Sequence, residues 1–212
     1  MAATLTTPNT LSGVFVPETD AAKLLKQLAM VVIGTGLLTI AAKVQVPLPP
    51  VPFTLQSLVV ALIAGAAGWR IGVATVALYI IEGLSGLPVF STGGGLDYVL
   101  RPSFGFILGW LPMAYVIGRA AERGVTRNLG ISLIVMLVAD AISFVFGFLW
   151  LMFVASIIVK AAGTLPTWIK ADDLVTTAWN GAVQPFIVWD AVKMLLAAFT
   201  VFAGWGLVSK GK

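Results

Sequence analysis

The sequence predicts an all-α fold: a polytopic membrane protein in which six transmembrane helices form one bundle. Hydrophobic residues make up 59% of the 212 residues, charged residues only 10%, and the mean hydropathy is +1.01. A soluble domain carries about 25% charged residues, so this composition is typical of a chain that lies in lipid. Several apolar runs reach the roughly 20 residues that a helix needs to cross a bilayer. The absence of cysteine and histidine from the sequence excludes disulfides, thiol catalysis, histidine-ligated metals and Ser-His-Asp triads.

Six apolar segments follow one another, and each predicts one helix. Their approximate bounds are residues 24–46, 55–67, 71–84, 103–121, 129–162 and 184–208. The second and third are short for a span, and we interpret Gly68-Trp69-Arg70 as a turn between two short helices; one broken hairpin is the alternative. The fifth segment is long for a single span, so we expect it to project past the membrane or to bend near Gly147.

The basic residues predict the orientation of the chain, because lysine and arginine concentrate on the cytoplasmic side of a membrane. With the N-terminus inside, eight basic residues lie on the cytoplasmic side: Lys23, Lys26, Arg70, Arg119, Arg123, Arg127, Lys210 and Lys212. Four lie on the opposite side, namely Lys43, Arg101, Lys160 and Lys170, and Lys193 stays within a span. Both termini are therefore predicted to be cytoplasmic. We expect residues 1–22 to form a cytoplasmic arm and residues 23–212 to form the transmembrane substrate-binding domain.

This orientation places three connections on the outer side: the proline-rich residues 47–52 and the loops 83–101 and 163–183. The turns on the cytoplasmic side are short by comparison. Long loops at one end of a bundle suggest a pocket that opens outward, with the loops acting as lids.

Asp190 and Lys193 lie inside the last apolar run, PFIVWDAVKMLLAAFTVFAGWGLV. Residues three apart share one face of a helix, so the carboxylate and the ammonium can meet. A charge at mid-bilayer costs roughly 2.5–3.5 kcal/mol on insertion scales, which favours a position facing a polar interior or a ligand. The pair is predicted to bind a polar ligand, with Trp189 beside it able to stack on a ring. A structural ion pair that neutralises itself is the alternative.

The segment VPLPPVPFTLQ must be extended, because its four prolines cannot all lie in a helix. Irregular backbone at membrane depth is tolerated only where protein covers it or where it lines a cavity. We therefore consider two interpretations. Either the segment lines a pocket, with Thr54 and Gln56 supplying polar contacts, or it is a rigid turn between helices.

The segment GLPVFSTGGGLDYVLRP combines glycines with polar side chains. Gly94 and Gly95 allow the backbone to approach a ligand closely. Asp97, Tyr98 and Arg101 follow, and the guanidinium could clamp a ligand carboxylate. Arg101 and Tyr98 could equally be anchors at the membrane interface. No Walker motif is present in the sequence, so the glycines do not indicate a nucleotide site.

Small residues recur at helical spacing in two places. Gly105 and Gly109 form a GxxxG pattern in the fourth segment, and Ala64, Gly68 and Gly72 repeat around the predicted turn. Such patterns permit close approach of helices. They indicate either packing within the monomer or a surface for docking another membrane subunit. Asp140, alone in the fifth segment, is a weak further signal of a polar site.

Three motifs together, VPLPPVPFTLQ, GLPVFSTGGGLDYVL with its following RP, and WDAVKMLLA, resemble the biotin-specific S component (BioY family) of energy-coupling-factor (ECF) vitamin transporters. The resemblance covers about residues 24–208. It implies a six-helix membrane bundle with cytoplasmic termini and an outward pocket closed by loops. It also implies biotin as the ligand. The family commonly has Gly-Pro-Thr-Gly-Gly-Tyr where this chain has Arg101-Pro102-Ser103-Phe104-Gly105-Phe106.

The resemblance suggests a role for each candidate residue. Asp190 suits the ureido N–H groups of biotin, Lys193 the ureido carbonyl or the carboxylate, and Arg101 is a second candidate for the carboxylate. Aromatic side chains suit the apolar ring. The full set of expected biotin-binding residues is Asp190, Lys193, Arg101, Tyr98, Asp97, Gln56, Thr54, Phe53, Phe90, Gly94, Gly95 and Trp189. We expect no catalytic residue, no metal site and no cofactor.

The resulting expectation is a biotin-capture subunit in the inner membrane of a prokaryote, not an enzyme. It would bind external biotin and deliver it inward with a transmembrane T subunit and two cytoplasmic ATPase subunits, since the sequence lacks a nucleotide motif of its own. No nucleic-acid partner is expected. Two alternatives stay open: an S component for another small vitamin, and an intramembrane enzyme that uses aspartate and lysine chemistry.

Overall fold

The computed structural model of the chain describes residues 9–15, 17–161 and 164–210. Within these residues, six helices build the bundle: α1 (Asp20–Lys43), α2 (Gln56–Ala67), α3 (Trp69–Leu84), α4 (Phe104–Glu122), α5 (Leu129–Ala161) and α7 (Ile187–Lys210). A short helix α6 (Leu174–Ala178) and a π-helical turn (Trp179–Val183) precede α7. The predicted all-α architecture is confirmed, and each predicted segment corresponds to one helix of the bundle.

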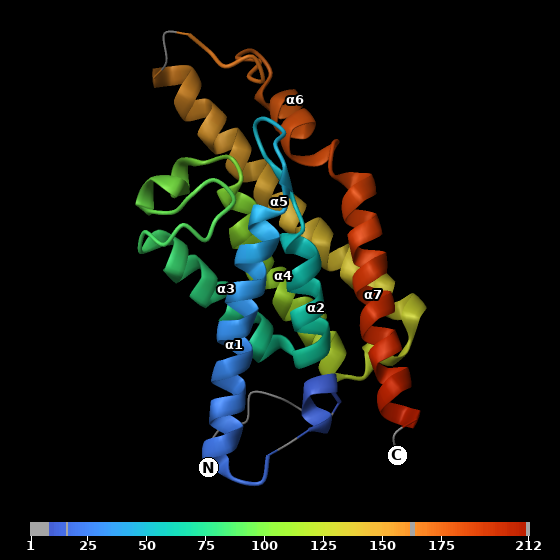
Figure 1. Cartoon of the computed structure of the whole chain (residues 1–212). Coiled ribbons are helices and arrows are strands. Elements are labelled where there is room, and N and C mark those ends of the chain that lie inside the picture. The colour runs from blue at the N-terminus through green and yellow to red at the C-terminus, as the bar shows by residue number, and fades with distance from the viewer. Residues whose placement is uncertain (1–8, 16, 162–163, 211–212) are drawn as a thin grey trace.

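The helices lie side by side, and α1 begins at the same end of the bundle at which α7 ends (Figure 1). We call this the termini end. The hairpin of β1 (Gln45–Val46) and β2 (Phe53–Thr54), the loop that contains a 3-10 helix (Leu96–Leu100), and α6 lie toward the opposite end, the loop end (Figure 1). All three long connections therefore share one end, as the predicted orientation requires.

The helices differ in their ability to cross a membrane. Helices α1, α4, α5 and the continuous segment Leu174–Val208 are long and apolar enough to do so. By contrast, α2 has 12 residues and α3 has 16. At 1.5 Å per residue they reach only about 18 and 24 Å, less than the roughly 30 Å hydrocarbon thickness. The predicted turn between two short helices is confirmed, with Gly68 at φ +90° joining them.

Small residues bring the helices of the bundle together. A Cβ atom on Gly105 would lie 2.2 Å from the Cβ of Trp150, and one on Gly109 would lie 2.8 Å from the Cα of Ser143. A Cβ atom on Gly72 would lie 3.0 Å from the Cβ of Ala64. Each of these glycines is therefore used for packing inside the monomer. Of the two interpretations of the small-residue patterns, packing within the monomer is therefore confirmed. These glycines are not available to dock another membrane subunit.

The proline-rich segment forms the hairpin at the loop end. Gln45 pairs with Thr54 and Val46 with Phe53 in antiparallel register, so the prolines lie in the connection, as their chemistry requires. The neighbouring loop is fastened to this region by its backbone carbonyls. Lys43 Nζ donates to the Phe90 carbonyl at 2.6 Å, and Gln45 Nε2 donates to the Ser91 carbonyl at 3.1 Å.

At the termini end, residues 9–15 pack against the bundle. A Cβ atom on Gly204 of α7 would lie 2.9 Å from Leu11 Cδ1, which shows how closely this segment approaches α7. Lys26 of α1 donates to the carbonyls of Ser12 and Phe15. Helix α1 begins at Asp20, capped by the hydroxyl of Thr19, slightly earlier than the expected residue 24.

The packing of the bundle predicts the effect of adding one methyl group. A Cβ atom on Gly118 of α4 would lie 2.2 Å from the backbone nitrogen of Trp69, which cannot rotate away. Gly118→Ala should therefore destabilise the protein by about 1–3 kcal/mol, the usual cost of overpacking. The matched control is Gly36→Ala on α1, where a Cβ atom meets nothing within 4 Å. Thermal unfolding in detergent measures both, and equal stabilities of the two variants would contradict the packing described here.

Candidate functional site

A cavity lies at the loop end of the bundle, and its empty space, together with the open solvent at its mouth, amounts to about 510 Å³. It is bounded by the hairpin, the loop that follows α3, and residues of α2, α4, α5 and α7. Its walls combine aromatic and aliphatic side chains with a small number of polar groups, the composition that is usual for a small-molecule site. The lining residues are Val51, Pro52, Thr54, Gln56, Ser57, Ser91, Tyr98, Ser103, Phe106, Ile107, Trp110, Ser143, Phe144, Phe186, Asp190 and Lys193.

The ion pair of Asp190 and Lys193 lies in this lining. The Lys193 Nζ is 2.7 Å from Asp190 Oδ1, and the two residues are only 7% and 5% exposed. Ser57, in the first turn of α2, donates its hydroxyl proton to Asp190 Oδ1 at 2.7 Å. Lys193 also donates to Ser57 Oγ at 3.0 Å and to the Thr54 carbonyl at 3.0 Å. The pair is thus held between α7, the hairpin and α2, and both charges are compensated.

A second set of hydrogen bonds connects the cavity to its surroundings. Thr54 Oγ1 donates to Gln56 Oε1 at 3.1 Å, and Gln56 Nε2 donates to the Tyr79 hydroxyl at 2.7 Å. That hydroxyl donates to the Val89 carbonyl at 2.8 Å. The start of α2 is therefore linked through α3 to the loop that covers the cavity. Buried polar groups that are satisfied in this way rigidify a site.

Hydroxyl groups line another part of the cavity. The Tyr98 hydroxyl lies 2.9 Å from Ser91 Oγ and 3.2 Å from Ser103 Oγ, so the three form a row. The row is neutral, and each hydroxyl can act as donor or acceptor. The cavity therefore presents charged groups from α7 and uncharged hydrogen-bonding groups from the loop.

Five of the predicted site residues line the cavity: Asp190, Lys193, Thr54, Gln56 and Tyr98. The proline-rich segment thus forms a turn between helices and also lines the cavity, so its two interpretations do not exclude each other.

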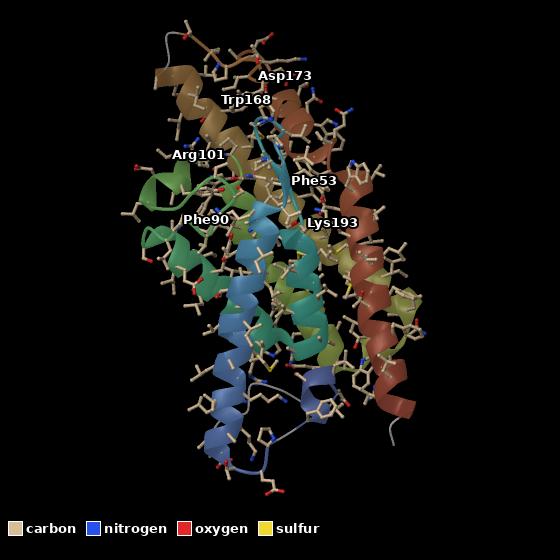
Figure 2. The ribbon with its side chains drawn as sticks, in the orientation of Figure 1. Phe53, Phe90, Arg101, Trp168, Asp173 and Lys193 are labelled. Atoms are coloured by element: carbon tan, nitrogen blue, oxygen red, sulfur yellow. The ribbon has the colours of Figure 1, made fainter. Side chains whose placement is uncertain are left out.

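The structure places the other predicted residues outside the lining. Phe53 packs behind the pair, with its ring centroid 4.4 Å from Lys193 Nζ (both residues are labelled in Figure 2). Phe90 is fully buried in the core, 4.4 Å from the ring of Tyr98. Trp189 is 59% exposed, because adjacent residues of a helix point about 100° apart and Asp190 faces inward.

Four loop residues predicted for the site also lie outside the lining. The side chains of Asp97 and Arg101 are exposed. Gly94 is needed for the fold of the loop, since a Cβ atom there would lie 2.1 Å from the Leu87 carbonyl oxygen. Gly95 has φ +98°, a conformation that favours glycine. Their contact with a ligand stays a prediction.

Sequence reasoning missed several lining residues. Ser57 lies in the first turn of α2 whereas Thr54 belongs to β2, so no helical spacing relates the two and the sequence carried no local signal for Ser57. Phe186 precedes Asp190 by four positions, and this spacing could have found it. Phe106, Trp110 and Phe144 are apolar residues of apolar helices and carry no local signal.

The contacts of Lys193 also bear on catalysis. Ser57 Oγ lies 3.0 Å from Lys193 Nζ, the separation of a serine and a lysine base. A base needs a free lone pair, whereas this ammonium is paired with Asp190 at 2.7 Å and donates to the Thr54 carbonyl. Lys193 is thus engaged by Asp190 and by the Thr54 carbonyl, which suits recognition of a polar ligand instead of activation of a nucleophile.

Comparison with protein families decides which class of protein carries this site. The sequence model of the BioY family matches residues 10–210. The chain belongs to the BioY family. One relative, from Lysinibacillus sphaericus, is 44% identical over 96 residues, 45% of this chain and 49% of that relative, so the match spans about half its length. The biotin transporter BioY of Rhizobium etli is 31% identical over 191 residues, 85% of this chain and 91% of that protein.

A solved structure has the same fold. The S-component for biotin from an ECF-type ABC transporter superposes with a TM-score of 0.71 at 26% sequence identity. The superposition covers 88% of this chain and 94% of that one. The predicted S-component fold is confirmed, and with it the assignment of this BioY chain to multi-pass membrane proteins of a transporter family.

The buried pair predicts a specific pattern of stabilities. Asp190→Asn or Lys193→Met alone leaves one buried charge without its partner, which should cost about 3–5 kcal/mol. The double variant removes both charges and should be more stable than either single variant. Thermal unfolding of the natural protein, the two single variants and the double variant in detergent gives a double-mutant cycle. Additive losses in the double variant would contradict a direct interaction between the two side chains.

Proposed function

We propose that this chain is the substrate-capture subunit of a biotin uptake transporter and that it binds biotin in the cavity at the loop end. The single observation that carries the proposal is the buried pair of Asp190 and Lys193 in the lining of this cavity. Membership of the BioY family and the similarity to a biotin S-component support the same ligand.

The chemistry of biotin suits the groups that line the cavity. Its ureido ring has two N–H donors and a carbonyl, and its other parts are an apolar thioether ring and a carboxylate tail. Asp190 receives its bonds from Lys193 and Ser57 at Oδ1, so Oδ2 is the oxygen to which a ureido N–H would donate. The Lys193 ammonium suits the ureido carbonyl or the carboxylate. Phe106, Trp110 and Phe144 provide an apolar wall for the thioether ring.

The remaining predicted residues complete this proposal. Tyr98, Thr54 and Gln56 offer uncharged hydrogen bonds within the cavity. Arg101, in the loop beside the cavity (Figure 2), is a candidate for the carboxylate after the loop has closed on the ligand. The three aromatic residues outside the lining would act indirectly. Phe53 would position the hairpin, Phe90 the loop after α3, and Trp189 helix α7.

The proposal extends to partners and topology. ATP hydrolysis would come from two cytoplasmic ATPase subunits joined through a transmembrane T subunit, since the sequence has no Walker motif. The protein would lie in the inner membrane of a prokaryote with both termini and the arm of residues 1–22 in the cytoplasm. The excess of basic residues at the termini end supports this orientation. The transmembrane domain would be residues 23–212.

Another small vitamin is the remaining alternative for the ligand. Equilibrium binding of labelled biotin to the purified protein separates the two. We expect saturable binding at sub-micromolar ligand. A lack of saturable binding in that range would refute the assignment to biotin.

Two variants test the residues proposed to hold biotin. Asp190→Asn and Lys193→Met should each weaken binding by about 1.5–3 kcal/mol, roughly ten- to a hundred-fold, because each removes a charge-assisted hydrogen bond. The matched controls are Asp172→Asn and Lys170→Met, the same chemical changes at exposed positions outside the cavity. Unchanged affinity in both Asp190→Asn and Lys193→Met would remove these residues from the binding site.

The orientation can be tested because the natural sequence has no cysteine. Arg123→Cys introduces a thiol near the termini end and Thr167→Cys one near the loop end, both at exposed positions. In intact cells, a membrane-impermeant maleimide should label Thr167→Cys, whereas Arg123→Cys should react only after permeabilisation. The opposite pattern would invert the proposed topology.

A further inference from the structure

Asp140 is a buried acid that the proposed contacts with biotin do not use. It lies in α5, where the other charged residue is Lys160 in the last turn, and it is only 3% exposed. One turn further along, Ser143 lines the cavity and donates to the Asp140 carbonyl at 2.8 Å and, more weakly, to Oδ1 at 3.4 Å. The carboxyl group therefore lies directly behind the wall that α5 contributes to the cavity.

The charges near Asp140 do not balance if every group is ionised. Its carboxylate lies within electrostatic reach of Asp190, which repels it, and of Lys193, which attracts it. Lys193 is already paired with Asp190 at 2.7 Å. Two acids thus share one amine, and full ionisation would leave a net negative charge inside a membrane bundle. Such a charge is strongly unfavourable without a counter-ion.

The proton needed for neutrality has one best position. Asp190 accepts two short hydrogen bonds, from Lys193 and from Ser57. The Asp140 carboxyl, by contrast, accepts a long hydrogen bond of 3.4 Å from the Ser143 hydroxyl. The remaining ionisable group in the lining is the hydroxyl of Tyr98, which lies within hydrogen-bond distance of Ser91 and Ser103. Tyr79 lies behind Gln56. The lining contributed by α2 and α4 consists of Gln56, Ser57 and apolar side chains, none of which carries a charge.

We propose that Asp140 is a proton-binding site of the cavity and that its proton is coupled to the binding of an anionic ligand. The proposal rests on the proposed function, since biotin carries a carboxylate. With the proton in place, Asp140, Asp190 and Lys193 together are neutral, and the ammonium is available to Asp190 and the ligand. Loss of the proton adds a negative charge that competes for Lys193 and repels the ligand, so affinity falls. At a pH where Asp140 is ionised in the empty protein, binding takes up a proton.

The first test is the affinity for biotin from about pH 6 to about pH 9, a range in which the biotin carboxyl, lysine and tyrosine change little. The dissociation constant of the natural protein should rise with pH, by up to about tenfold per pH unit where one proton is linked to binding. Asp140→Asn cannot titrate and should give a flat profile. Asp172→Asn, the same change at an exposed position, should keep the natural profile. A flat natural profile, or an equal slope in Asp140→Asn, would overturn the proposal.

Two further measurements separate this inference from the proposed function. Infrared spectra of the ligand-free protein near neutral pH should contain the carbonyl stretch of a protonated carboxyl group that Asp140→Asn lacks and that Asp172→Asn, with its change at an exposed position, retains. This readout needs no ligand, so absence of biotin binding would refute the proposed function alone. If Asp140→Asn does not fold, calorimetry of the natural protein in two buffers of different ionisation enthalpy counts the protons taken up with biotin. A count of zero across the pH range would overturn the proposal.

Discussion

The ion pair between Asp190 and Lys193 is the interaction on which the organisation of the loop end depends. Charged groups inside a membrane bundle must be enclosed and hydrogen-bonded, because lipid offers them no partner. Here the enclosure comes from three elements: α7 carries the pair, α2 supplies the Ser57 hydroxyl, and the hairpin supplies the Thr54 carbonyl. The requirement to satisfy two charges thus ties together segments that are more than 130 residues apart.

The short length of α2 and α3 makes room for this arrangement. Helices of 12 and 16 residues cannot fill the bundle from one membrane face to the other. The space beyond the start of α2 is covered instead by the hairpin and by the loop after α3. Hydrogen bonds from Lys43, Gln45 and Tyr79 to backbone carbonyls fasten that loop. A cavity at the loop end of the bundle is the consequence.

The sequence predicted the six helices of the bundle well because lipid imposes a simple requirement. A spanning segment must be apolar and must satisfy its own backbone, so composition alone reveals it. The pair Asp190 and Lys193 was predictable for the same reason, since charges in an apolar run stand out. Phe186 could have been found from its spacing relative to Asp190. Phe106 and Trp110 could not, because one apolar residue in an apolar helix resembles every other.

The sequence by itself determined the class of protein, the number of helices in the bundle and the meeting of Asp190 with Lys193, because these follow from hydropathy and from the periodicity of one helix. Only the tertiary structure decided which side chains share the cavity. Trp189 and Asp190 are neighbours in sequence, yet one is 59% exposed and the other is buried. Ser143 and Ser57 come from different helices, yet both line the cavity with the pair. Which face of a helix points inward depends on its packing partners, and local sequence does not specify them.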